Sequence, residues 1–285
     1  MLKTNVGTEL SHSTINSILR RNNLISPEKS ARQTPPIRFE YEKPNQLWQM
    51  DFKGGFVLLD KSSCFPLTIL DDHSRFNLCL KASSNQIFKT VQEGLITTFR
   101  KYGLPDKILT DNGPPWGAAG HYTSSGEVSL SALEIWLIRL NIQVLHGRPY
   151  HPQTQGKEER FHRTLKTELL QFEKFKNIDH CQRRFNYWRN KYNQERPHEA
   201  IGFKTPANIY TSSSRSFKET LPQIEYNQED IVRNVGRNGC INIKNQVFKV
   251  GKGLINQPVA IRQTALENVL DVYFCNQKIK QIIRG

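Results

Sequence analysis

The stretch LWQMDFKGGFVLLD, Leu47 to Asp60, begins the globular part of the chain. With the following segments FPLTILDD and FNLCLKA, it predicts three strands joined by short turns rich in Gly, Ser or Asp. Antiparallel hairpins fit these lengths. Asp51 lies inside the first strand pattern, between Met50 and Phe52. A carboxylate there is unfavourable unless a positive partner or a metal ion compensates it.

The next segments predict helices that alternate with strands. NQIFKTVQEGLITTFRKYG places Ile87, Val91, Leu95 and Phe99 on one helical face and ends at Gly103. DKILTD then reads as a short strand, SLSALEIWLIRL as a helix and IQVLHG as another strand. Three strands followed by this alternation predict an α/β fold with a mixed sheet flanked by helices.

Two more helices and a β-rich tail complete the pattern. Lys157 to Leu170 is helical in periodicity, and HCQRRFNYWRNKYNQE carries Phe185, Trp188 and Tyr192 along one side. Beyond the polar break TSSSRS, six short alternating segments predict a small all-β barrel or sandwich of about 60 residues. They are DIVRNVG, CINIKN, QVFKVG, PVAIRQ, VLDVYFCN and KIKQIIR.

The N-terminal region predicts one amphipathic helix over Ser11 to Asn22, with Arg20 and Arg21 at the end where cations suit the helix dipole. We interpret it as part of a helix-turn-helix that reads DNA; a lone helix docked on the next domain is the alternative. The predicted division is a helical segment at 1–32, a linker at 33–45, a core at 46–210, a linker at 211–226 and a barrel at 227–285.

Composition narrows the class of partner. The 285 residues carry a formal net charge of +14, spread along the chain, which favours a polyanion such as nucleic acid. The five cysteines are scattered with no CxxC pair, which predicts core thiols in a reducing compartment. No apolar run is long enough for a signal core or a membrane span. We therefore expect a cytoplasmic protein with no membrane partner.

Three carboxylates from distant segments are candidates for one metal site. Asp111 follows Ile108 and Leu109 at the carboxyl end of a predicted strand, where sites assemble in α/β sheets. Glu158 and Glu159 begin the helix after the segment GRPYHPQTQG. Oxygen ligands of this kind suit Mg²⁺, and two such ions support phosphoryl transfer. The alternative for Asp111 is a turn residue, because Asp-Asn-Gly is a common turn sequence.

The chain resembles the insertion-sequence transposases that share the retroviral-integrase catalytic core. The resemblance lies in LWQMDFKG, LTILDDHSRF, ILTDNGPPW, HGRPYHPQTQGKEERFHRTLKTELL and YNQERPHEAIGFKTPANIY, which follow in the family's order between Gln46 and Tyr210. The tail from VGRNGCINIKNQVFKVG onward also resembles the small β domain that ends many of these transposases.

This resemblance implies a ribonuclease H-like fold with a five-stranded mixed sheet. It also implies that Asp51, Asp111 and a glutamate after QTQGK form a DDE set that binds two Mg²⁺ ions, or Mn²⁺ in their place. In this family the glutamate usually precedes an Arg-Phe pair or a similar one, which selects Glu159 over Glu158. Helical periodicity independently places Glu158 toward Phe161 and Leu165, and Glu159 toward His162 and Arg163.

Basic residues surround the third carboxylate. We expect contacts with DNA from this set, with the solvated face of a helix as the alternative: Arg148, Lys157, Arg160, Arg163 and Lys166. His151 is a further candidate for contact with the substrate, although a histidine between two prolines more often shapes a loop. Asp71, Asp72 and His73 read as residues of a hairpin turn.

The implied activity is cleavage at transposon ends and transfer of the 3'-hydroxyl into target DNA. The expected partners are terminal repeats, target DNA and at least one further copy of the chain, in association with a bacterial nucleoid. One alternative is a nuclease that only cuts. Another is an N-terminally shortened, non-catalytic regulator. The 47 residues between Asp111 and Glu159 exceed the family's usual spacing, and the surplus falls in GAAGHYTSSGEVS, Gly117 to Ser129.

Overall fold

The structure is a computed structural model of the chain and describes residues 11–22, 40–111, 113, 115–116, 130–147 and 156–284. The central sheet has five main strands in the spatial order β4-β3-β1-β5-β6. They are β1 (Leu47–Phe52), β3 (Ser63–Asp71), β4 (Asn77–Ser83), β5 (Lys107–Thr110) and β6 (Gln143–His146). β1, β3 and β4 are antiparallel neighbours, and β5 and β6 run parallel to β1. The predicted ribonuclease H-like mixed sheet is confirmed.

A sixth short strand, β2 (Phe56–Val57), pairs with β3 beyond the end of β1. Lys53 donates its backbone N–H to Pro66 at 2.9 Å, and Gly54 and Gly55 then interrupt the ladder. β2 therefore continues β1 along the edge of β3 after a break at two glycines. The sequence prediction treated β1 and β2 as one strand.

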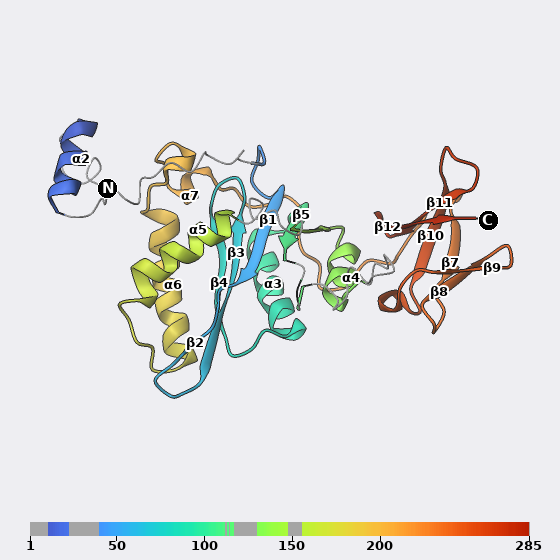
Figure 1. The fold of residues 1–285 in the computed structure, drawn as a ribbon, viewed down its shortest axis with the longest axis horizontal. Helices are drawn as coiled ribbons and strands as arrows, with labels where there is room; N and C mark the ends of the chain where they lie inside the picture. Colours follow the sequence, from blue (N-terminus) through green and yellow to red (C-terminus); the bar gives the residue numbers. More distant parts are fainter. Residues whose placement is uncertain are drawn as a thin grey trace.

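Helices cover both faces of the sheet (Figure 1). α3 (Phe88–Tyr102) and α4 (Ala132–Arg139) pack on the face that carries Trp48, Met50 and Leu67. α5 (Gly156–Leu165), the π-helical segment η3 (Lys166–Leu170) and α6 (Ile178–Gln194) pack on the face of Leu70 and Leu80. Each face thus has its own apolar core.

The helical faces follow the predicted periodicity. Val91, Leu95 and Phe99 of α3 are buried, as are Phe185, Trp188 and Tyr192 of α6. Ile87 differs from the prediction: it precedes α3 as the N-cap and is 54% exposed, because the helix begins one residue later. Gly103 ends α3 with a positive φ of 78°, and a Cβ there would lie 2.8 Å from two backbone oxygens of residues 213 and 215.

Three of the five cysteines confirm the predicted core thiols. Cys64, Cys79 and Cys181 are buried, whereas Cys240 and Cys275 are only partly covered. Among the described residues no helix is both long and apolar enough to cross a membrane. The short helix α7 (Pro206–Ile209) follows the 3₁₀ turn η4 (Glu199–Ile201) and begins at Pro206, as predicted.

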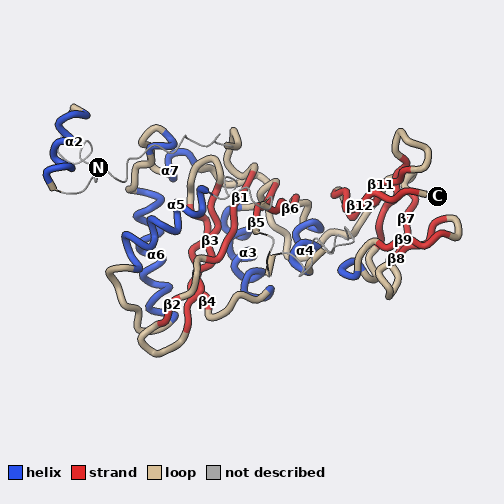
Figure 2. The backbone as a smooth tube through the Cα atoms, viewed as in Figure 1, coloured by secondary structure: helices blue, strands red, loops and turns tan. Residues whose placement is uncertain are grey.

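All six predicted tail segments are strands. They are β7 (Ile231–Asn234), β8 (Cys240–Ile243), β9 (Gln246–Lys249), β10 (Pro258–Gln263), β11 (Val269–Phe274) and β12 (Gln277–Ile283), with a 3₁₀ turn η5 (Lys252–Leu254). Their hydrogen bonds form an open four-stranded sheet, β12-β11-β10-β7, and a separate β8-β9 hairpin. The all-β region is therefore built of two antiparallel sheets, seen as strands in Figure 2.

The segment between the core and this β region is docked on the core along part of its length. Arg215 donates to the carbonyl oxygens of Leu140 and Asn141 at 3.1 and 2.7 Å, and Ser213 N–H donates to Tyr102 at 2.8 Å. Arg139 also donates to Pro222 at 3.0 Å. At the other end, Tyr226 donates its hydroxyl to Pro258 of β10 at 2.7 Å.

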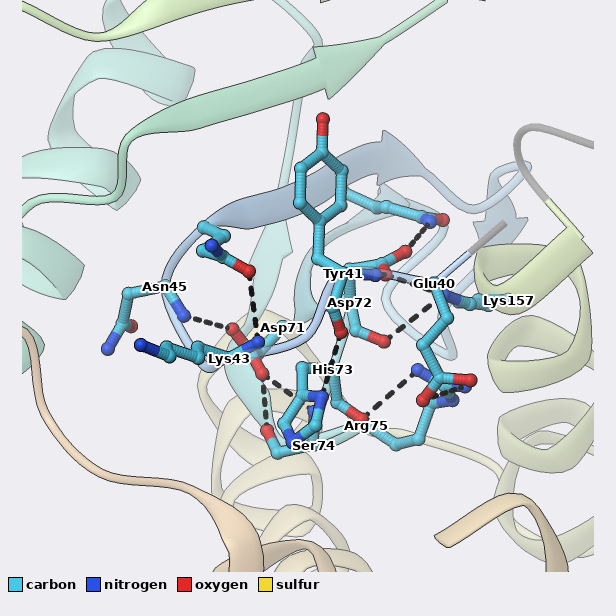
Figure 3. A network of polar contacts seen from close by, with 12 residues as sticks. Glu40, Tyr41, Lys43, Asn45, Asp71, Asp72, His73, Ser74, Arg75 and Lys157 are labelled. Atoms are coloured by element: carbon cyan, nitrogen blue, oxygen red, sulfur yellow. Dashed lines mark hydrogen bonds and ion pairs between the residues drawn. The ribbon is translucent and has the colours of Figure 1, made fainter. Parts of the chain in front are cut away.

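The buried turn between β3 and β4 braces the start of α5 (Figure 3). Asp71 accepts N–H groups from Asn45 at 2.7 Å and Ser74 at 2.8 Å, so it shapes the turn as predicted. Asp72 is 1% exposed and accepts Gln49 Nε2 at 2.7 Å. It also pairs with Lys157 Nζ at 2.6 Å. This ion pair holds the helix that carries the third predicted ligand against the sheet.

Removal of one partner of this buried pair should destabilise the fold. Asp72→Ala leaves the Lys157 ammonium, already depressed in pKa by burial, without its carboxylate. We expect the free energy of unfolding to fall by about 3 kcal/mol in urea titrations. Glu229→Ala, which removes an exposed carboxylate, is the matched control and should change it by less than about 0.5 kcal/mol. Equal effects would show that the pair contributes nothing specific.

Candidate active site

Asp51 and Asp111 lie at the same edge of the sheet. Asp51 is near the carboxyl end of β1, and Asp111 directly follows β5. β1 and β5 are parallel neighbours, so their carboxyl ends meet. α5 contacts β1 and brings Glu159 to this region. The structure therefore brings the three predicted carboxylates to one edge.

The three carboxylates interact electrostatically. Burial and the charges of Asp111 and Glu159 together raise the pKa of Asp51 to about 6, against the N–H of Phe52, which lowers it. Burial also raises the pKa of Asp111, against the Gly113 N–H, which donates to Oδ1 at 3.0 Å. Repulsion of this kind is relieved when a cation lies between the acids.

Glu158 and Glu159 have opposite environments. Glu158 is 2% exposed, and burial together with the charge of Asp51 raises its pKa well above the usual range. Its Oε1 has no hydrogen-bond partner within the described part of the chain, and its side chain lies with Phe161 and Leu165 among the buried residues of α5. Glu159 is exposed. A neutral, enclosed carboxyl group is a poor ligand for a cation, so the environment favours Glu159.

Thr68 connects Asp51 to the buried glutamate. It is the cross-strand partner of Asp51, and its Oγ1 lies 3.0 Å from Asp51 O, 3.1 Å from Glu158 Oε2 and 2.9 Å from His162 Nε2. A hydroxyl group has a single proton, and the Asp51 carbonyl only accepts. If Thr68 donates to that carbonyl, Glu158 must be protonated to donate to Thr68. A protonated Glu158 agrees with its pKa, which burial and the charge of Asp51 raise.

His162 lies on a different side of α5 from the one that periodicity predicts. Its Nε2 is 3.6 Å from Glu158 Oε2, and its Nδ1 is 3.9 Å from Asp51 Oδ2. Glu158 and His162 are four residues apart, so they lie on one helical face. Burial and the charge of Lys53 lower the pKa of His162 to about 4, which leaves the ring neutral at pH 7.

Asp111 has its own histidine. His146 Nδ1 lies 3.0 Å from the Asp111 carbonyl oxygen, and Nε2 lies 2.9 Å from Glu134 Oε1. Burial lowers the pKa of His146, but hydrogen bonds to Glu134 and to Asp111 outweigh it and raise the pKa above its ordinary value. Each of the two aspartates therefore lies beside a histidine that contacts a buried glutamate.

The donor set fits a hard divalent cation in its chemistry, since all three groups are carboxylates at a partly desolvated edge. In the ranges that the structure describes, no three acidic, His or Cys side chains are gathered closely enough to hold an ion. Asp51, Asp111 and Glu159 as metal ligands therefore remain a prediction.

A cavity of about 550 Å³ lies beyond the end of β1. Lys53, Gly54 and Gly55 line one side, and Lys166 and Lys174 line the other. The Lys53 pKa is lowered by burial and then by the charge of Lys166, so the two ammonium groups lie within electrostatic reach. This arrangement places two cations at the exit of β1.

The other predicted DNA contacts differ in exposure. Arg160 and Arg163 are exposed on α5, and Arg20 and Arg21 are exposed at the end of α2 (His12–Arg21). Lys157 forms the ion pair with Asp72 that is described above. Arg148 and His151 lie outside the described residues.

Sequence reasoning missed Lys53, Thr68, Glu134 and His146, and it placed His162 without assigning it a contact. Thr68 could have been found from the strand register, because it is the cross-strand neighbour of Asp51. His146 ends the strand parallel to β5 and pairs with Thr110 in register. No sequence pattern singles out Glu134 beyond its place in the first turn of α4.

Comparisons with known families agree with this architecture. Two profiles described as integrase core domain match residues 41–152 and 140–206. The chain carries an integrase core domain. A third profile, the C-terminal domain of the IS481 transposase family, matches residues 230–283, the β region after the core. The resemblance to insertion-sequence transposases with an integrase-like core is thus confirmed.

Individual relatives match parts of this chain. It is 24% identical over 205 residues to an uncharacterized 31.7 kDa protein of insertion element IS407 from Burkholderia multivorans, covering 70% of this chain and 69% of that protein. It is 33% identical over 132 residues to a Gag-Pro-Pol polyprotein of mouse mammary tumor virus, covering 46% of this chain and only 7% of the polyprotein.

Solved structures with a similar fold include retroviral integrases. A simian T-cell lymphotropic virus intasome in complex with a PP2A regulatory subunit has a TM-score of 0.49 at 17% identity, with 95% of this chain and 90% of that chain covered. The HTLV-2 integrase catalytic core in complex with magnesium has a TM-score of 0.43 at 16% identity, with 60% and 99% covered.

Substitution of the two adjacent glutamates should separate their roles. Glu158→Gln preserves the size and neutrality of the buried group, so the free energy of unfolding should change by less than about 1 kcal/mol. Glu159→Gln should leave stability unchanged and weaken Mn²⁺ binding, measured by calorimetry, by about tenfold or more. If Glu158→Gln weakened the binding and Glu159→Gln did not, the assignment of the third ligand would be reversed.

Proposed function

We propose that this chain is a DNA transposase that cleaves at the ends of a mobile element and joins the 3'-hydroxyl to target DNA. The observation that carries the proposal is the convergence of Asp51, Asp111 and Glu159 at one edge of an integrase core. The exposed basic residues beside these acids, and the net charge of +14, supply the attraction for a polyanionic substrate.

The acids would hold two divalent cations, Mg²⁺ or Mn²⁺, through their carboxylate oxygens. When bound, such ions activate the attacking hydroxyl and stabilise the leaving oxygen of a phosphodiester. Asp51 and Asp111 are suited to this role because burial raises the pKa of both and the charge of Asp111 raises that of Asp51, so a bound cation would relieve an unfavourable environment. Glu159, exposed on α5, completes the set.

The chain's own cations would orient the DNA. Lys53 and Lys166 line the cavity at the exit of β1, and the ammonium group of neither forms a hydrogen bond or ion pair with another described residue. Phosphate groups next to the scissile bond would neutralise both. Arg160 and Arg163 extend the basic surface along α5. Contacts of this kind set position and orientation on the duplex and leave sequence reading to other parts.

The partners are the terminal repeats of the element and the target DNA, with at least two copies of the chain on paired ends. The division into a helical segment at 1–32, a core at 46–210 and a β region at 227–285 stays a prediction, as do its linkers. We place the protein with the bacterial nucleoid, where its substrate lies.

Asp111→Asn tests the central claim. The amide removes the charge that attracts the cations while it keeps the side chain's size, so Mg²⁺-dependent cleavage and strand transfer should fall by about a thousandfold or more, a loss of about 4 kcal/mol of transition-state stabilisation. The assay uses oligonucleotides that carry the element's terminal repeats, with joined products resolved on a gel. Asp179→Asn, at an exposed position on α6, is the control and should keep full activity.

An unchanged rate in Asp111→Asn would overturn the assignment of Asp111. A wild-type chain that cuts but never joins would indicate a nuclease, and one that binds repeats without cutting would indicate a regulator.

Lys53 and Lys166 can be tested through salt dependence. Each lysine that neutralises a phosphate releases a counterion, so Lys53→Gln and Lys166→Gln should each reduce the slope of log K against log salt concentration by about 1. Fluorescence anisotropy with a labelled duplex gives this slope. Lys61→Gln, in the exposed β2–β3 turn, is the matched control. Slopes that equal the control's would place the DNA elsewhere.

A further inference from the structure

We propose that Glu134 and His146 are positioning residues that fix the carboxylate of Asp111 for cation binding. This inference rests on the proposed function, because it concerns the same site. Asp111 lies just past the last residue of β5 and outside the β5–β6 register. Something else must therefore determine where its carboxylate lies.

The first support is the backbone of Asp111. His146 is the last residue of β6 and pairs in register with Thr110, the residue before Asp111. Its Nδ1 lies 3.0 Å from the Asp111 carbonyl oxygen. A carbonyl oxygen only accepts, so Nδ1 carries the proton of this hydrogen bond. The histidine thus holds the main chain of the residue that follows the strand.

The second support reaches the carboxylate itself by another route. Glu134 Oε2 accepts Ser131 N–H at 2.6 Å, and Ser131 Oγ donates to the Trp116 carbonyl at 2.8 Å. Trp116 N–H donates to Gly113 O at 2.9 Å. Gly113 N–H then donates to Asp111 Oδ1 at 3.0 Å.

Glu134 joins the two routes into a closed ring. One of its oxygens serves Ser131, and the other lies 2.9 Å from His146 Nε2. The ring begins at the Asp111 carbonyl and returns to the Asp111 carboxylate, so neither can rotate without breaking one of its hydrogen bonds. Packing of Trp116 on Phe52, with ring centroids 5.2 Å apart, ties the ring to the residue next to Asp51.

A helix cap alone does not account for Glu134. Its capping box with Ser131 needs one carboxylate oxygen, and such boxes normally lie at the surface, where water serves the other. Here the side chain is only 2% exposed and the second oxygen faces an imidazole. A buried carboxylate is unfavourable unless it is paired in this way. The capping box therefore accounts for one oxygen of Glu134 but not for its contact with His146.

The two ring nitrogens of His146 allow a test that a purely structural role would fail. In His146→Asn the amide nitrogen takes the place of Nδ1, so the hydrogen bond to the Asp111 carbonyl is retained and the contact with Glu134 is lost. In His146→Gln the amide nitrogen takes the place of Nε2, so the contact with Glu134 is retained and the hold on Asp111 is lost.

Binding of Mn²⁺ to the full chain without DNA is measured by calorimetry, with metal-free thermal unfolding in parallel. Outer partners of ligands typically contribute 10- to 100-fold to metal affinity, so His146→Gln should weaken Mn²⁺ binding by about tenfold. His146→Asn should keep an affinity within about threefold of wild type, because the Asp111 carbonyl and the Glu134–Ser131 contact are both still held, whereas Glu134→Ala should resemble His146→Gln because it removes the acceptor of Ser131 N–H as well as the contact with His146. Glu93→Gln, an exposed acid on α3, should change nothing.

The outcomes separate this inference from the proposed function. If wild type binds Mn²⁺, Asp111→Asn does not, and His146→Gln and Glu134→Ala bind as wild type does, the positioning role is overturned while the metal site stands. Equal weakening by His146→Asn and His146→Gln, with matching losses of thermal stability, would also overturn it in favour of a structural role. If wild type binds no Mn²⁺, both the inference and the proposed function fall.

Discussion

The arrangement of this core depends on the electrostatic penalty of placing carboxylates side by side at a partly buried sheet edge. The charges of Asp111 and Glu159 raise the pKa of Asp51 there, and Asp51 in turn raises the pKa of Glu158, a fourth carboxyl group behind it. The chain offsets this penalty in two ways. Burial and the charge of Asp51 keep Glu158 neutral, and the Gly113 and Phe52 N–H groups donate to the two aspartates. The repulsion that remains favours a cation at the site.

Buried polar pairs hold this edge from behind. Asp72 and Lys157 fix the start of α5, and the β1–β3 register places Thr68 opposite Asp51. The site is thus carried on strands and a helix whose orientations are determined by buried hydrogen bonds, which favours a defined geometry over an adaptable one. The stabilising contacts and the proposed chemical groups alternate along the same elements, with Glu158 next to Glu159 and Asp72 one strand away from Asp51.

The elements that depend on local patterns were predictable from sequence. Apolar periodicity of 2 and 3.6 residues gave β1, β3, α3 and α6, and Gly103 and Pro206 marked helix boundaries because their backbone preferences act locally. The contrast between Glu158 and Glu159 also followed from helical periodicity. His162 did not, because it lies at a boundary of the helical face where a rotation of a few degrees changes its neighbours.

The ring through Glu134 and His146 could not be predicted from the sequence, for a different reason. Its members come from three segments, and the hydrogen bonds between them depend on how those segments pack in three dimensions. The split of the tail into a four-stranded sheet and a hairpin was hidden likewise, since strand patterns do not state which strands pair.

The docking of residues 213–222 on the core has a consequence for how the β region can act. Arg139 anchors Pro222, Tyr226 is bonded to β10, and Asn276 of the β region donates to Asn141 of the core at 3.1 Å, so the unanchored part of the connection is short. Four peptide steps span at most about 14 Å. A connection this short keeps the β region at a high effective concentration near the core. DNA bound to one of the two would therefore be at a high local concentration for the other.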